Sequence, residues 1–137
     1  MVKSTGLYQG DLNCQLTHGP SGKIIETDAP VDNQGRGLAF SPTDLTAASL
    51  ASCMVTTMAL VARKQLGFDL AGTRWEVAKE MSADAPRRIV RLTVLIRLSC
   101  PKAKDPAGLL EQAARNCPVW HSLHPAVEKV LALHWRD

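Results

Sequence analysis

The chain has 137 residues, of which 45% are hydrophobic and 21% are charged, so it has enough apolar material for the core of one globular domain. Aromatic residues make up only 4% and the net charge is +3 with scattered basic residues. These values exclude the base-stacking surfaces and concentrated positive charge of nucleic-acid-binding proteins. The N-terminus has no apolar segment typical of a signal peptide, so we expect a cytoplasmic protein whose four cysteines are thiols, ligands or catalysts rather than structural disulfides.

Alternating polar and apolar residues predict the first strands. Residues 8–18 alternate throughout, which predicts one strand whose buried face carries Tyr8, Leu12, Cys14 and Leu16. Residues 21–23 predict a turn, and the segment after it predicts a second strand over residues 23–30. Residues 31–37 predict a loop, which a short strand near residues 38–40 follows.

A long helix is predicted over residues 41–66. Ser41 is a suitable N-cap, Pro42 occupies the first helical position, and Asp44 lies three residues after the cap, where its carboxylate suits the positive end of the helix. Gly67 is typical of the position just after a helix ends. The spacing therefore indicates a capping role for Asp44.

This helix has no polar side. Residues 45–62 contain no charge, which would suit a membrane span by length alone, but they include several Ser and Thr and lie between segments that alternate like strands. We therefore expect a core helix and no membrane association. A helix that is apolar all round is buried on all sides, and a small domain has difficulty surrounding a helix of roughly 37 Å. A partner subunit is expected to cover part of it.

The second half of the chain predicts strands, then helices, then a strand. Residues 73–80 and 87–100 alternate as strands, and the second has its apolar face at Val90, Leu92, Val94, Ile96 and Leu98. Residues 105–116 predict a helix with Asp105 as cap, and Cys117 with Pro118 opens a short helix to about residue 124. For residues 126–135 a strand is favoured over a helix. The chain is therefore predicted to be one α+β domain, residues 1–137, with a segregated antiparallel sheet.

The four cysteines differ in their surroundings. Cys14 on an inward strand face and Cys100 at a strand end are expected to be structural. Cys53 lies about nine residues inside the long helix, where the helix dipole has faded, so a cation from elsewhere would have to lower its pKa. Cys117 precedes Pro118 at a helix start, where free N–H groups favour a thiolate, and by position it is the better nucleophile.

Cys117, His121 and His124 are the candidate ligands for a metal site. Their spacing would place three possible zinc ligands within a turn or two of helix, but a closed structural site needs four and no acidic residue stands nearby. The alternative is that both histidines lie on the exposed edge of a short helix. No nucleotide-binding or serine-hydrolase motif is present. We therefore predict no metal and no cofactor.

Two stretches, FSPTDLTAASLASCMVTTMAL and ARNCPVWHSLHPAVEKV, carry a family resemblance. Together with the HGPSGK turn, they resemble the OsmC/Ohr superfamily, the osmotically inducible and organic-hydroperoxide-resistance proteins. The resemblance implies antiparallel sheets packed around a long central helix, in an intertwined homodimer with the long helices at its centre and active sites at the subunit interface. It also accounts for a helix without a polar side.

The chemistry that the resemblance implies is a thiol-dependent peroxidase. Cys53 would attack an organic hydroperoxide as a thiolate and become a sulfenic acid, and Cys117 would condense with it to a disulfide. A small dithiol, such as a lipoyl group, would reduce the disulfide. The alternative is a non-catalytic OsmC-like dimer that binds an apolar small ligand.

The same resemblance suggests two further site residues, Asp44 and Arg36. The family has a glutamate ten residues before the first cysteine, where this chain has Thr43, and Asp44 follows one step later. In a straight helix Asp44 and Cys53 lie on opposite faces and roughly 13 Å apart, so Asp44 would cap the helix or orient a bridging cation. The family's activating arginine comes from near the N-terminus, and Arg36, in the loop before the helix, is the candidate here.

Overall fold

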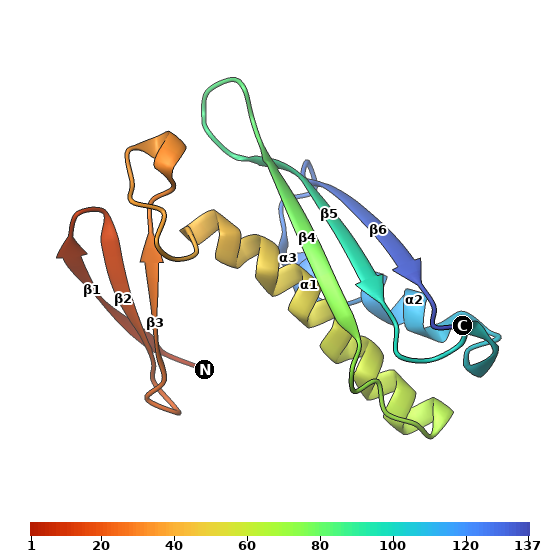
Figure 1. Ribbon diagram of the computed structural model, residues 1–137. Helices are drawn as coiled ribbons and strands as arrows, with labels where there is room; N and C mark the ends of the chain where they lie inside the picture. Colours follow the sequence, from red (N-terminus) through yellow and green to blue (C-terminus); the bar gives the residue numbers. More distant parts are fainter. The chain divides into compact units, whose positions relative to one another are not determined.

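The structure is a computed structural model that describes all residues, 1–137. The chain divides into two compact units, residues 1–46 and residues 47–137, and each is described by itself. The prediction of a single domain remains a prediction. The predicted α+β class is confirmed, because strands and helices both occur and the strands form two separate three-stranded sheets (Figure 1).

The first unit contains an antiparallel sheet of order β1-β2-β3, formed by β1 (Ser4–Gly10), β2 (Asn13–His18) and β3 (Ile24–Asp28). The prediction of one strand over residues 8–18 is wrong, since a hairpin turn divides this segment. Gly10, Asp11 and Leu12 have positive φ angles of 89°, 51° and 60°. Glycine and aspartate adopt this region readily, so the Gly-Asp pair is turn chemistry within an otherwise alternating pattern.

The predicted turn at residues 21–23 and the strand after it are confirmed, but the strand predicted near residues 38–40 is absent. The predicted loop contains a short 3-10 turn, Val31–Asn33. Beyond it, the Phe40 carbonyl accepts one backbone hydrogen bond, from Asp28 N at 3.1 Å. One such bond does not make a ladder, and Leu38 and Phe40 are both exposed.

Helix α1 (Pro42–Val61) begins and continues as predicted. It runs on through a π-helical segment, Ala62–Leu66, to Gly67, whose φ of 76° is the left-handed conformation of a helix C-cap. By length and composition alone, Pro42–Leu66 would suit a membrane span. Long core helices of soluble proteins meet the same criterion, so this is weak evidence for a membrane.

Within this chain, α1 is buried on one side only. Its buried side chains are Ala47, Leu50, Ala51, Met54 and Met58. Beyond Pro42 at its start, the exposed ones recur at helical spacing and are Ser49, Ser52, Thr56 and Leu60. The prediction is a helix buried on all sides of which a partner subunit covers part, and a single chain does leave one face of α1 exposed. The reason is that one sheet and two short helices cover a single face of a long helix.

The second unit has the sheet order β4-β5-β6, formed by β4 (Arg74–Met81), β5 (Ile89–Arg97) and β6 (Glu128–His134). β4 pairs with β5 in antiparallel fashion, but β6 pairs with β5 in parallel. The predicted antiparallel sheet is thus corrected at its last strand. The chain returns through α2 (Leu109–Arg115) and α3 (Pro118–Ser122), and such a crossover permits parallel pairing.

Asp105 caps α2 from a distance. The helix was predicted to begin at residue 105 but begins at Leu109, after Gly108 with a φ of 70°. The Asp105 carboxylate accepts hydrogen bonds from Leu109 N at 2.8 Å and Leu110 N at 2.9 Å. The capping prediction is therefore confirmed, although three residues lie between Asp105 and Leu109, the first helical position.

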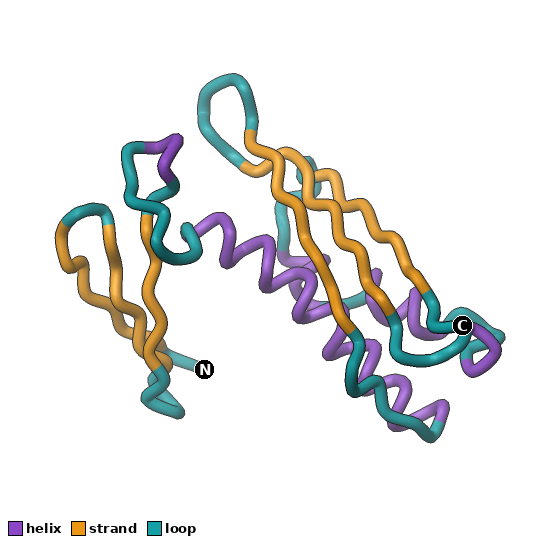
Figure 2. Tube along the Cα trace, in the orientation of Figure 1, coloured by secondary structure: helices purple, strands orange, loops and turns teal.

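The core of the second unit lies between the sheet and its three helices. The inward face of β5 contributes Leu92, Val94 and Ile96, all fully buried, as its alternation predicts. α1 contributes Leu50, Met54 and Met58, and α2 contributes Leu110. Figures 1 and 2 show the helices of this unit on one face of β4-β5-β6. Cys53 and Cys117 both belong to this packing.

Candidate functional site

Helix α1 carries Cys53 in its interior. The residue is half-buried, whereas the adjacent Met54 is fully buried. The Cys53 carbonyl accepts a hydrogen bond from Thr57 Oγ1 at 2.8 Å, one turn further along. Cys53 is thus a thiol at the edge of the core, on a rigid element with regular helical hydrogen bonding.

Cys117 is the N-cap of α3, as the sequence indicates. Its backbone is extended, with φ of −67° and ψ of 148°, and Pro118 occupies the first turn. Its Sγ accepts a hydrogen bond from Trp120 N at 3.4 Å, in the manner of a capping side chain. The residue is fully buried. Its sulfur is therefore held in one orientation inside the core.

The fold brings these two thiols together. They are 64 residues (117 minus 53) apart in the sequence, yet the Cys53 thiol lies close enough to Cys117 to raise the pKa of that residue. Both are free thiols. A half-exposed sulfur beside a fully buried one is an arrangement in which oxidation of the first can be followed by disulfide formation with the second.

The pKa of Cys117 is raised, which corrects a prediction. Burial is the main cause, and the neighbouring Cys53 thiol raises the pKa further. The Trp120 N–H lowers it, as expected at a helix start, but only in part. α3 has five residues, so its dipole is small, and loss of solvation outweighs it. The helix position does favour the thiolate, but the prediction that Cys117 ionises readily is wrong, because burial outweighs that local effect.

Asp44 caps α1, as predicted from its spacing. Ser41 N donates to Asp44 Oδ2 at 2.9 Å, and Asp44 N donates to Ser41 Oγ at 3.1 Å. This reciprocal pair is a capping box with aspartate in place of the usual glutamate or glutamine. It satisfies two donors at the start of the helix that carries Cys53.

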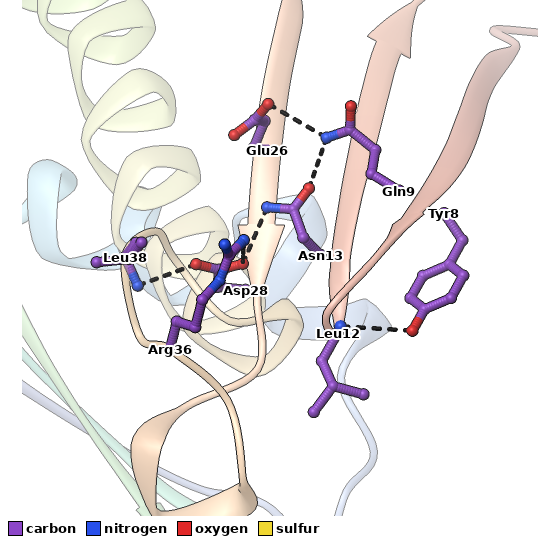
Figure 3. Close-up of polar contacts among 8 residues, drawn as sticks. All are labelled: Tyr8, Gln9, Leu12, Asn13, Glu26, Asp28, Arg36 and Leu38. Carbon is purple, nitrogen blue, oxygen red and sulfur yellow. Dashed lines mark hydrogen bonds and ion pairs between the residues drawn. The ribbon is translucent and has the colours of Figure 1, made fainter.

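Arg36 is paired with a buried carboxylate. Its guanidinium lies 3.6 Å from Asp28 Oδ1, and Asp28 is only 1% exposed. Asp28 also accepts from Asn13 Nδ2 at 2.9 Å and from Leu38 N at 3.0 Å (Figure 3). The Asn13 hydrogen bond is the main cause of a lowered pKa for Asp28, to which Leu38 N and Arg36 also contribute. Asp28 therefore stays ionised and fastens the loop that carries Arg36 to the sheet.

The remaining cysteines and histidines have local explanations. Burial is the main cause of a raised pKa for Cys100, which is 5% exposed, while Cys14 is half-buried on β2. His121 Nε2 lies 3.3 Å from Asn116 Oδ1, and His124 Nδ1 accepts from Ala126 N at 3.1 Å. Nowhere in the chain do three or more His, Cys, Asp or Glu side chains form a group suited to a metal ion.

Two structural features of the chain are not predicted from its sequence. One is the Asn13–Asp28 pair, for which the sequence offers only an aspartate at the end of a strand. The other is Trp120 of α3, which lies against two cations, Arg115 and Lys129. A signal for the second was present, because Lys129 interrupts the apolar positions of an alternating strand.

Comparison with known proteins identifies the family. The profile of the family described as OsmC-like protein matches residues 35–130, which is more than half of the chain. The chain therefore belongs to the OsmC-like family, and the resemblance predicted from its cysteine stretches is confirmed. No curated protein sequence matches the chain.

Solved structures support the same fold. The chain is 43% identical to a protein of Psychrobacter arcticus 273-4 assigned to the osmotic stress induced and detoxification response, with a TM-score of 0.89 over 98% of this chain and 96% of that one. It resembles the organic hydroperoxide resistance protein OsmC of Legionella pneumophila, at 17% identity and a TM-score of 0.77 over 98% and 96%. It also resembles OhrB of Bacillus subtilis, at 19% identity and a TM-score of 0.69 over 97% of each chain. The last two likenesses concern the fold alone.

Proposed function

We propose that this chain is a thiol-dependent peroxidase that reduces organic hydroperoxides through Cys53 and Cys117. The observation that carries the proposal is the pair of neighbouring free thiols, which long-range packing brings together in the core. Membership of the OsmC/Ohr family supports a role in peroxide resistance or redox chemistry.

The proposed cycle has three steps. The Cys53 thiolate attacks the terminal oxygen of a hydroperoxide ROOH, which yields Cys53 sulfenic acid and an alkoxide that takes up a proton to become ROH. Cys117 then attacks the Cys53 sulfur, so that a disulfide forms and water leaves. A small dithiol, such as a lipoyl group, finally reduces the disulfide by thiol exchange and is itself oxidised.

The difference in burial supports the division of roles. Cys53 is half-exposed and can be reached by a substrate, whereas Cys117 is fully buried. Burial raises the pKa of Cys117, so this residue rests as a neutral thiol and does not compete for the peroxide. Cys53 is therefore proposed as the attacking thiol and Cys117 as the resolving thiol.

Arg36 is proposed as the cation that activates the attacking thiol, and Asp44 as a supporting residue. Arg36 has 51% of its side chain exposed, so its charge is available to a second partner besides Asp28. Asp44 acts through the cap that fixes the start of α1. Arg36→Gln is expected to slow oxidation of Cys53, and Arg36→Lys, which keeps the charge, to restore part of the rate. An unchanged rate in Arg36→Gln would remove Arg36 from the mechanism.

We further propose that the chain forms a homodimer in the cytoplasm. The first unit exposes many large apolar side chains, which are Leu7, Tyr8, Leu12, Ile24, Ile25, Val31, Leu38 and Phe40. Large exposed apolar surfaces mark sites of protein interaction, and α1 also has an exposed face. The dimer interface is expected to exceed about 2,000 Å² in total. Sedimentation at micromolar concentration tests this, and a monomer would contradict it.

A second candidate function is the binding of an apolar ligand without catalysis. The first unit contains a groove of about 440 Å³ with mainly apolar walls, which include Leu7, Leu16 and Leu45. Cys14 also lines it. In this case the Cys53–Cys117 pair would not reduce peroxide catalytically. An apolar fluorescent probe would bind with equal affinity to the wild type and to Cys53→Ser.

Mass spectrometry after brief exposure to cumene hydroperoxide separates the two functions. The wild type is expected to lose two thiols per chain, and Cys117→Ser to stop at a sulfenic acid on Cys53 or beyond it. Cys53→Ser should show no fast reaction. Cys14→Ala and Cys100→Ser serve as controls and should consume peroxide at nearly the wild-type rate. If neither member of the pair is oxidised, the peroxidase proposal fails and ligand binding becomes the better account.

A further inference from the structure

The Trp120 ring lies beside two cations that come from different elements. Arg115 Cζ is 5.7 Å from the ring centroid, and Lys129 Nζ is 5.6 Å from it. Arg115 ends α2, Trp120 belongs to α3 and Lys129 belongs to β6. Both distances are within the range of cation–π attraction, so three elements meet at one indole ring. We call Arg115, Trp120 and Lys129 the tryptophan clamp.

Lys129 occupies an inward register position. Half-buried and exposed residues alternate along β6, and Lys129 shares the half-buried side with Leu131 and Leu133. In the parallel ladder it pairs with Leu92, which is fully buried. A lysine at an apolar position loses part of its hydration, which costs free energy. Here its ammonium donates to the Val127 carbonyl at 3.0 Å and lies over Trp120, and these contacts offset that cost.

The short helix α3 depends on such contacts for its position. It has five residues, and an isolated helix of that length is not stable in water. Two of its local contacts are the hydrogen bond from Trp120 N to Cys117 Sγ, at 3.4 Å, and the ring contacts within the tryptophan clamp. Trp120 therefore makes both contacts: its backbone N–H donates to the Cys117 sulfur, and its ring lies against the two cations.

We propose that Trp120 is a positioning residue for Cys117 in the resolving step, and that Arg115 and Lys129 hold it in place. This inference rests on the proposed function. In the step, the Cys117 sulfur attacks the sulfur of Cys53 sulfenic acid, the S–O bond breaks, an S–S bond forms, and the hydroxyl group leaves as water with the thiol proton. Closure requires the two Cβ atoms to come within about 4.5 Å, so a displaced α3 slows it.

A competing reaction makes the rate of closure measurable. A second hydroperoxide can oxidise Cys53 sulfenic acid to sulfinic acid and is itself reduced to the alcohol. The fraction of Cys53 that reaches sulfinic acid at a given peroxide concentration therefore rises when closure slows. A merely structural effect on the whole fold would lower the rate of sulfenic acid formation as well.

The experiment uses four variants of the tryptophan clamp, one control variant outside it, and quenched-flow mass spectrometry with cumene hydroperoxide. Trp120→Leu removes the ring, Arg115→Gln and Lys129→Met each remove one cation, and Trp120→Phe keeps an aromatic ring. Glu111→Gln is the matched control for Arg115→Gln, because it breaks the same ion pair (2.9 Å) and leaves the arginine in place.

We expect sulfenic acid formation at the wild-type rate in all variants. Closure should fall about tenfold in Trp120→Leu, as misplacement of a reacting group by a fraction of an ångström predicts, and about threefold in each cation variant, with a matching rise in sulfinic acid. Trp120→Phe and Glu111→Gln should stay within about twofold of the wild type. If Trp120→Leu does not fold, the two cation variants decide the question.

Normal sulfenic acid formation with unchanged closure in the folded variants would overturn this inference alone. A wild type in which Cys53 forms no sulfenic acid would overturn the proposed function and this inference with it. Equal losses in both steps would also overturn it, since they would show a structural role without a specific effect on Cys117.

Discussion

Replacing Asp105 by alanine removes the cap of α2, the helix that precedes Cys117. Asp105 is 2% exposed, and its two carboxylate oxygens accept hydrogen bonds from Leu109 N at 2.8 Å and Leu110 N at 2.9 Å. Gly108, at the N-cap position, has no side chain that could replace them. Asp105→Ala therefore leaves two backbone donors at the start of the helix without a side-chain partner.

The expected cost follows from these two bonds. Loss of an N-cap typically costs about 0.5–2 kcal/mol, and a buried donor left without a partner costs about 1–3 kcal/mol. Because Asp105 serves two donors, the free energy of unfolding should fall by about 2–4 kcal/mol in Asp105→Ala. Asp105→Asn keeps an amide oxygen that can accept one of the bonds, so its loss should be about half as large.

Urea denaturation at fixed protein concentration, with a reductant present, measures these changes. Glu111→Gln lies on the same helix and breaks only an exposed ion pair with Arg115, so it should cost no more than about 0.5 kcal/mol. A result for Asp105→Ala within about 0.5 kcal/mol of the wild type would refute the capping argument. An asparagine variant as unstable as the alanine variant would show that the carboxylate charge, rather than the two acceptors, is what matters.

Three further predictions concern other parts of the chain. Asp28→Ala should release the loop that carries Arg36, so trypsin should cleave after Arg36 several-fold faster than in the wild type, and equal rates would contradict the fastening role. Met54→Ala, at a fully buried position beside the thiol pair, should lower the free energy of unfolding by about 2–5 kcal/mol, whereas Ser52→Ala on the exposed face of α1 should change it by less than about 0.5 kcal/mol. Burial raises the pKa of Cys100, so the folded thiol keeps its proton where the unfolded chain loses it, above about pH 8.5. The contribution of Cys100 to stability is therefore complete below that pH and is lost as the pH rises toward the folded-state pKa, and Cys100→Ala should reduce the fall in stability between pH 7.5 and 9.5 in urea denaturation.

Sequence patterns alone determine the local elements of this protein. Ser41 and Asp44 mark the start of α1 and Gly67 marks its end, because caps act on backbone groups within a few residues. The alternation along β5 identifies its buried face because side chains of a strand point to opposite sides in turn. The two cysteine stretches likewise identify the family without any structure.

Only the tertiary structure decides the pairings between distant segments. β6 has the alternation of a strand, but its parallel direction depends on the crossover through α2 and α3, which periodicity does not encode. Strand periodicity also continues through residues 8–18, where the backbone turns at Gly10 and Asp11. The alternation of β6 is the same for parallel and antiparallel pairing. The alternation of residues 8–18 is the same for one continuous strand and for a hairpin.

The thiol pair depends on the tertiary structure most of all. Position at a helix start predicts a lowered pKa for Cys117, because local N–H groups stabilise a thiolate. The fold buries the sulfur completely and places Cys53 beside it, and both changes raise the pKa. Loss of solvation and the approach of a residue 64 positions (117 minus 53) away are properties of the packed chain, so the sequence identified the two cysteines while the fold decided how readily Cys117 ionises.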